Sequence, residues 1–309
     1  MKTLFKNDKN LYKANLHCHT IVSDGRYSPE EIKASYVKEG YNIVAFTDHR
    51  VLQSHSHLSD ENFLALNALE VDINQQVTSG AAKTYHFNLY AASPDIAVTP
   101  PPPTMNYRDA AAINQYIAER NTEGFLVCYN HPRWSLQTFE EYSRLKGCFA
   151  MEIYNHNCEV ADGLCGYNPY VYDEMLRYGE YSKNTNLFCL STDDNHDQID
   201  RFGGFIQISS PSLKYEDVIN SLKMGNFYSV NCSHELKIHE ISLDGDELTV
   251  RCSPCHTIAV YTNGRRCYVQ PGENDGIAKF QISSKTDGYI RVMCRDEKGN
   301  DANSNAYWL

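Results

Sequence analysis

Short apolar runs alternate with helical patterns from residue 14 to about residue 208. A run that is apolar at nearly every position predicts a strand buried on both faces. The predicted strands cover residues 14–18, 42–47, 125–130, 150–154, 187–191 and 205–208, and the predicted helices cover residues 28–40, 109–118, 170–178 and 215–224. Repeated strands and helices of this length predict a barrel-like α/β domain.

The clearest helix start lies at Ser28. Serine is a preferred N-cap residue, Pro29 suits the first helical turn, and Glu31 completes a capping box. Gly40 is placed to end this helix. The apolar residues 42–47 follow directly, so this part of the chain predicts a strand–helix–strand unit.

The pattern changes after about residue 232, where apolar and polar positions alternate, as at Ile290, Val292 and Cys294. Such alternation is typical of antiparallel strands with one buried face. Two pairs typical of hairpin turns lie between such runs, Asp244-Gly245 and Asn263-Gly264. The chain is therefore divided into an α/β domain over residues 1–231 and a small antiparallel β-sandwich over residues 232–309.

Ionisable residues follow the predicted strands of the first domain. His49, Glu70, His131, Asp194 and His196 come at or just after strand ends, and His17 and His19 share one face of the strand over residues 14–18. The carboxyl ends of barrel strands converge on one mouth. Any one of these residues alone is best interpreted as an ordinary hydrogen-bonded or solvated side chain. Together they would be costly to bury without cations, and imidazole with carboxylate suits zinc, iron or manganese.

The composition of the chain limits the kinds of binding partner that we expect. The net charge of -11 argues against a broad nucleic-acid surface, although bound cations could still attract a small anionic substrate. We find no apolar run of membrane-spanning length and no secretory signal in the first ten residues. We therefore expect a cytoplasmic protein with no membrane partner, whose 11 cysteines are mostly reduced core residues. The oligomeric state is left open.

These motifs, in this order, resemble the PHP (polymerase and histidinol phosphatase) superfamily of metal-dependent phosphoesterases. The resemblance covers roughly residues 12 to 230. It rests on these pieces: His17-Cys18-His19-Thr20, Ser23-Asp24-Gly25, Thr47-Asp48-His49, the segment ending at Glu70, His86, His131-Pro132-Arg133 and Asp194-Asn195-His196. It implies a distorted (β/α)7-type barrel, related to the TIM barrel, in a stand-alone member that carries a small β domain.

The resemblance also implies a cluster of two or three divalent ions (iron, manganese or zinc). His17 and His19 would bind one metal, and Glu70 would bridge it to a second, with Asp194 nearby. His86 and His131 would complete the second site, and Asp24, His49 and His196 would hold a third. Two features depart from the family: Ala68 replaces the usual glycine before the glutamate, and an extra aspartate, Asp193, precedes Asp194.

The implied reaction is hydrolysis of a small phosphorylated metabolite, such as a nucleotide or a sugar phosphate. The nucleophile would be a metal-bound hydroxide held by His17, His19, Glu70 and Asp194. Arg133, two residues after a predicted ligand, is a candidate phosphate clamp, and a surface arginine is the alternative. Two other functions remain open: metal-dependent hydrolysis of a non-phosphate ester or amide, and a non-catalytic regulatory PHP module.

One further motif, Cys252-Ser253-Pro254-Cys255-His256, has the spacing of a haem attachment site. It lies in the predicted β domain of a chain expected to stay in the cytoplasm, where such haem is not attached. We interpret it as a Pro-containing turn between two strands, with a zinc or redox site as the alternative.

Overall fold

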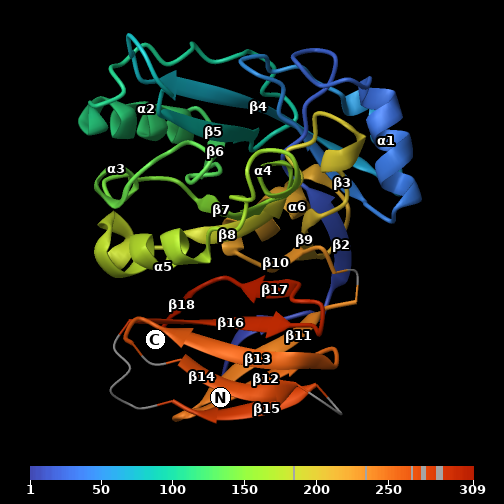
Figure 1. The fold of residues 1–309 in the computed structure, drawn as a ribbon. Helices are drawn as coiled ribbons and strands as arrows, with labels where there is room; N and C mark the ends of the chain where they lie inside the picture. Colours follow the sequence, from blue (N-terminus) through green and yellow to red (C-terminus); the bar gives the residue numbers. More distant parts are fainter. Residues whose placement is uncertain (184, 234, 266, 273–275, 283–287) are drawn as a thin grey trace.

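The computed structural model describes residues 1–183, 185–233, 235–265, 267–272, 276–282 and 288–309. Within these residues the strands form one 14-stranded sheet and one four-stranded sheet. Figure 1 shows the helices grouped around β2 to β9 in one part of the molecule, and β11 to β18 stacked in the other. The mixed α/β fold class is therefore confirmed.

In the large sheet the strands pair in one continuous order, and one further strand, β18, pairs outside that order. In spatial order its strands are β14 (Cys267–Gly272), β13 (Cys255–Thr262), β16 (Tyr289–Arg295), β17 (Asp301–Ser304), β10 (Phe227–Asn231), β9 (Gly204–Ser210), β2 (Asn10–Asn15), β3 (Ile43–Phe46), β4 (Leu64–Asn74), β5 (Thr84–Ala91), β6 (Phe125–Tyr129), β7 (Ala150–Asn155) and β8 (Phe188–Thr192), while β18 (Tyr307–Trp308) pairs with β16. The small sheet contains β1 (Lys2–Lys6), β11 (Ile238–Asp244), β12 (Glu247–Cys252) and β15 (Ile277–Gln281).

Helices connect and cover the strands. The α-helices are α1 (Pro29–Lys38), α2 (Ala110–Thr122), α3 (Phe139–Tyr142), α4 (His156–Val160), α5 (Pro169–Tyr178) and α6 (Tyr215–Met224), and the 3-10 helices are η1 (Ser56–Leu58), η2 (Glu180–Lys183) and η3 (Gln198–Asp200). The capping box predicted at Ser28 is present, because Ser28 accepts from the backbone of Glu31 and the Glu31 side chain accepts from the backbone of Ser28. Across the described residues, none of these helices combines the length and apolarity needed to cross a bilayer.

The strand directions depart from a simple β/α repeat. β2, β3 and β4 pair in parallel, as do β6, β7 and β8. β5 pairs antiparallel with both β4 and β6, and β9 pairs antiparallel with β2. Within the described residues no strand ladder joins β8 to β9, so the structure does not confirm a closed barrel.

The β-rich tail, residues 232–309, packs against the rest of the chain through both sheets. β1, from the N-terminus, pairs antiparallel with β11, and β17 pairs with β10. Apolar side chains of the small sheet share one core with those of β13 and β16, among them Leu248, Val250, Ile258 and Val292. The other face of β16 buries Arg291, which donates to Asp173 of α5 at 2.7 and 2.8 Å. The boundary at residue 231 stays a prediction, since strands from both sides of it pair with one another.

Candidate metal centre

All nine residues that the resemblance nominates as ligands come together at one end of the strands. His86 lies in β5 and Glu70 lies in β4, while the others stand in the segments that follow β2, β3, β6 and β8: His17, His19, Asp24, His49, His131, Asp194 and His196. Most of these side chains are buried, and Asp24, His49 and His196 lie nearer the surface. The nine positions therefore form one cluster, whose role as a metal centre is a proposal argued below.

His17 and His19 lie just beyond a strand and not within it. β2 ends at Asn15, and Cys18 forms only an isolated parallel bridge with Asn195. The strand expected over residues 14–18 therefore begins and ends earlier than predicted. The two imidazoles still converge, with their Nε2 atoms 3.1 Å apart.

Glu70 occupies the centre of the cluster. Its Oε2 atom lies 3.4 Å from His17 Nε2, 3.3 Å from His19 Nε2 and 3.3 Å from His49 Nδ1. Its Oε1 atom lies 2.9 Å from His86 Nδ1 and 3.4 Å from His131 Nε2. The two oxygens of one carboxylate thus face two different sets of imidazoles, which is the arrangement a bridging ligand requires.

Two aspartates complete the arrangement. Asp194 Oδ1 lies 3.1 Å from His17 Nε2 and 3.2 Å from His19 Nε2. Asp24 lies on the outer side, 3.4 Å from His49 Nε2, 3.5 Å from His19 Nδ1 and 3.6 Å from His196 Nε2. The side chain of Asp24 is therefore placed among three histidines, at the more exposed end of the cluster.

The donor atoms fall into sets small enough for single ions. The sets with all donor atoms within 4.8 Å of one another are His17, His19 and Glu70; Glu70, His86 and His131; His17, His131 and Asp194; and His19, Asp24, His49 and His196. The first two sets follow the partition that the resemblance implies, and the other two differ from it. His131 also lies with His17 and Asp194, and His19 also lies with the outer group around Asp24.

Glu152 belongs to this network, and the sequence reasoning missed it. Its Oε1 atom lies 2.7 Å from His17 Nδ1 and accepts from Thr192 Oγ1 at 2.6 Å. Its Oε2 atom accepts from the backbone N–H of His131 at 3.0 Å. The available signal was a single glutamate inside the apolar run of β7, because a buried carboxylate needs partners of this kind.

Lone pairs converge on the cluster, which is what a cation needs. Glu152 holds a proton on His17 Nδ1, so when His17 is neutral, as a metal ligand must be, the lone pair of its Nε2 faces His19 Nε2 and two carboxylate oxygens. In the described part of the chain, His19 Nδ1 and Asp194 Oδ1 are buried without a hydrogen-bond partner. The residues present therefore fit the divalent ions that the resemblance implies.

The charges in the cluster shift the pKa values of its members in opposite directions. Burial lowers the pKa of His17, but the carboxylates of Asp194, Glu70 and Glu152 outweigh it, and the pKa lies well above its usual value. Burial raises the pKa of Glu70, but His86 and His17 hold it well below its usual range. Without metal, His17 therefore holds a second proton that balances part of this negative charge. A metal ion bound at His17 would displace that proton.

A cavity of about 290 Å³ opens onto the cluster. Its lining residues are Asp24, His49, Glu70, His86, His131, Trp134, Asn157, Asp162, Asp194 and His196. Arg133, the candidate phosphate clamp, is exposed and is not among them. Trp134 lies there instead, with its ring centre 4.9 Å from that of His131 and its Nε1 donating to Asp162 at 3.1 Å.

Three local features fix the loops that carry the ligands. Asp194 has a φ of 53°, a left-handed conformation that is rare for residues other than glycine. Asp193, before it, accepts from the Tyr36 hydroxyl and from three backbone N–H groups of residues 202–204, so it anchors the loop and lies outside the donor sets. Gly25 packs against the backbone of His19, where a Cβ would lie only 2.4 Å from His19 O.

Comparison with known proteins gives a match at the level of fold. No family model and no curated protein matches the chain. A two-domain protein from Bacteroides vulgatus, which contains a predicted PHP-like metal-dependent phosphoesterase, matches 100% of this chain and 98% of its own, with 14% identity and a TM-score of 0.50. At this identity the likeness shows a shared fold. The fold resemblance that the motifs predict is therefore confirmed.

Two other solved structures match part of the chain. One, from Bifidobacterium adolescentis, is provisionally described as a metal-dependent phosphoesterase; it matches 62% of this chain and 90% of its own, with 14% identity and a TM-score of 0.42. The other is an amidohydrolase from Chromobacterium violaceum with bound sulfate and no metal, which matches 59% of this chain and 87% of its own, with 13% identity and a TM-score of 0.37. Matches this weak carry no argument about function.

Proposed function

We propose that this chain is a metal-dependent hydrolase that cleaves the phosphate ester of a small metabolite, such as a nucleotide or a sugar phosphate. The observation that carries the proposal is the position of Glu70, whose two oxygens face the nitrogens of five histidines. A carboxylate placed in this way can bridge two divalent ions, and paired ions can stabilise the oxygens of a phosphoryl group during displacement.

Two or three ions of iron, manganese or zinc suit this donor set, with His17, His19, Glu70, His86, His131 and Asp194 holding the inner ions and Asp24, His49 and His196 the outer one. The chemistry that such ions supply when bound is charge neutralisation at the phosphoryl oxygens and a water whose pKa is lowered to about 7.

The chain's own residues orient the donors and shape the substrate cavity. Glu152 fixes the tautomer of His17 through Nδ1 and holds the backbone of His131. Trp134 packs against His86 and His131 and gives the cavity one apolar wall. Asn157 lines the same cavity, where its amide can donate to a substrate oxygen.

Hydrolysis of a non-phosphate ester or amide is the second candidate. One observation favours it: the described residues that line the cavity include no lysine or arginine, whereas they include the carboxylates of Asp24 and Asp162. A phosphate dianion would rely on the metal ions alone for its positive charge. A neutral ester or amide would not need that charge.

A substrate panel separates the two candidates. Protein reconstituted with each metal is assayed on an aryl phosphate monoester, a phosphodiester, an aryl carboxylic ester and an anilide, with and without EDTA. We expect turnover of a phosphate ester that EDTA abolishes and that Glu70→Gln lowers more than about 100-fold in kcat. Exclusive turnover of the carboxylic ester or anilide would support the second candidate. No turnover of any substrate by fully loaded protein would contradict both.

We also propose that the curved sheet approaches a distorted (β/α)7-type barrel around this cavity and that residues 1–231 and 232–309 act as two domains. Two contacts support the barrel. A Cβ at Gly204 of β9 would lie 1.9 Å from Thr192 O of β8, and Ser229 of β10 donates to Cys189 O of β8. Both contacts bring β8, the last strand in the order of the large sheet, close to β9 and β10.

A further inference from the structure

Cys252, Cys255 and Cys294 bring three thiols together in the β-rich tail. Cys252 ends β12 and Cys255 begins β13, so the turn predicted at Ser253-Pro254 is present between them. Cys294 comes from β16, where it pairs with Ile258 of β13. The three sulfur atoms lie within 4.8 Å of one another, and the side chains are 3%, 8% and 0% exposed. The sequence motif showed two of these thiols, and the fold adds the third.

The spacing of the sulfur atoms matches that of thiolates on one zinc ion. Cys252 Sγ and Cys255 Sγ are 3.9 Å apart. Two sulfurs that each lie about 2.3 Å from a zinc ion at a tetrahedral angle are about 3.8 Å from each other. A disulfide needs about 2.05 Å, so this pair is not bonded. The two-residue separation of Cys252 and Cys255 is also the usual separation in structural zinc sites.

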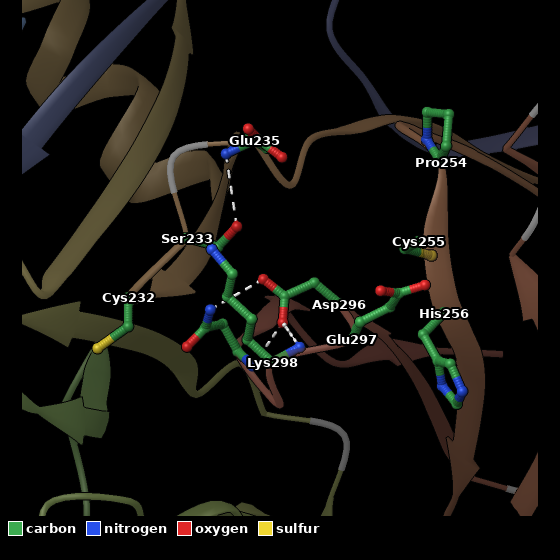
Figure 2. Close-up of a pocket in the computed structure, with 10 residues that line it drawn as sticks. Cys232, Ser233, Glu235, Pro254, Cys255, His256, Asp296, Glu297 and Lys298 are labelled. Atoms are coloured by element: carbon green, nitrogen blue, oxygen red, sulfur yellow. Dashed lines mark hydrogen bonds between the residues drawn. The ribbon is translucent and has the colours of Figure 1, made fainter.

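A cavity of about 580 Å³ lies beside the three thiols and is lined in part by Cys255, which gives them a route to solvent. Figure 2 shows Pro254 and Cys255 on one wall of this cavity, which Asp296, Glu297 and Lys298 also line. His256 is exposed, and its Nδ1 lies 2.8 Å from Thr257 Oγ1, so its imidazole is not part of the thiol group. A fourth ligand would therefore come from the cavity.

We infer that Cys252, Cys255 and Cys294 bind one zinc ion through three thiolates, with the fourth position facing the cavity beside Cys255. The site is separate from the candidate metal centre and does not depend on the proposed function. Cys252 belongs to the four-stranded sheet, while Cys255 and Cys294 belong to the large sheet. A zinc ion held by all three would join the two sheets and stabilise the tail.

The ordinary alternative is a group of reduced core cysteines, since free cysteine packs as a small apolar residue. The other buried cysteines provide an internal comparison. Cys128 and Cys148 are equally buried, and within the described residues neither belongs to a set of donors close enough to hold an ion. Convergence of three thiols is therefore a feature of this position and not of the protein's cysteines in general.

Cobalt substitution tests the site without any assay of activity. Full-length protein is freed of metal under reducing conditions and titrated with Co²⁺. We expect an intense sulfur-to-cobalt charge-transfer band, which the histidine and carboxylate donors of the other centre cannot give. Zinc should then remove this band, because it competes for the same thiolates. Absence of the band in protein that takes up cobalt would overturn the inference.

Variants and alkylation identify the ligands. Cys294→Ser should abolish the band and lower the zinc content by one ion per chain, whereas the matched control Cys148→Ser should leave both unchanged. Because a variant could fail to fold, wild-type protein is also alkylated with and without zinc and mapped by mass spectrometry. Zinc should protect Cys252, Cys255 and Cys294. Equal labelling in both samples, or an intact mass showing a disulfide in protein kept free of oxidant, would contradict the site.

Discussion

Glu152 Oε1 lies 2.7 Å from Nδ1 of His17, and both side chains are fully buried. The same carboxylate accepts from Thr192 Oγ1, from the backbone of His131 and from Asn155 Nδ2. One side chain thus ties together the segments that follow β2 and β6 and the last residues of β7 and β8. Its position decides which nitrogen of His17 faces the cluster.

Glu152→Gln is therefore expected to weaken metal binding about 10- to 100-fold, the usual effect of losing a group that orients a metal-binding histidine. The amide can offer an N–H to His17 Nδ1, which would move the imidazole proton to Nε2. Equilibrium dialysis against a metal buffer measures the affinity, and Glu216→Gln on the exposed face of α6 is the control. Equal affinity in the two variants would show that Glu152 does not orient His17.

Trp134 and Arg133 form a matched pair for testing the cavity wall. Both side chains are exposed, but only Trp134 lines the cavity. We expect Trp134→Ala to lower kcat/KM by roughly tenfold or more through KM, because it removes an apolar wall, and Arg133→Ala to stay within about twofold. Metal content should be unchanged in both. A large loss in Arg133→Ala alone would restore Arg133 as the phosphate clamp.

Asp193→Asn should destabilise the fold. Asp193 Oδ1 accepts from the backbone of Gly203 and Gly204, and Oδ2 accepts from Phe202 and from the Tyr36 hydroxyl. An asparagine would turn an NH₂ group toward some of these donors, at a cost of about 1–3 kcal/mol. Urea unfolding in EDTA measures the change, and exposed Asp8→Asn is the control. Equal stability would mean that the loop rearranges freely.

Metal affinity should rise with pH. Burial lowers the pKa of His196, but Asp24 and Asp194 outweigh it and raise the pKa to about 9. The pKa of His17 is raised in the same way. Metal-free protein therefore holds protons on these imidazoles at neutral pH, and binding must release them. Calorimetry in buffers of different ionisation enthalpy should detect this release. An affinity that stays constant from about pH 6 to about pH 9 would contradict the assignment of His17 and His196 as ligands.

Several members of the cluster could be predicted because they follow strands whose ends meet, whereas Asp24 and His86 were nominated only by the family resemblance. His49, His131 and Asp194 each come after an apolar run, so their proximity follows from strand order alone. Glu152 was missed because it lies inside a strand, where a single charge has no periodicity to mark it. Trp134 was missed because the direction of a side chain in a loop depends on packing that local pattern does not encode.

Strand pairing was the less predictable part of the fold. The run over residues 64–74 forms one long strand, parallel to β3 at its start and antiparallel to β5 at its end. The pairing of β1 with β11 joins residues more than 200 positions apart, and no local signal specifies it. No local signal placed Cys294 beside Cys252 and Cys255 either, because its position depends on the pairing of β13 with β16.

The histidines around Glu70 are proposed to hold metal ions. Anomalous diffraction from crystals of protein prepared without chelator, measured at the absorption edges of iron, manganese and zinc, would locate such ions. We predict two or three anomalous peaks among the nine ligands, with Glu70 in contact with two of them, and the loss of these peaks in Glu70→Gln. A peak at the three cysteines would be separate. Well-ordered density for Glu70 and the histidines, with no anomalous peak among them even after soaking in each metal, would contradict it.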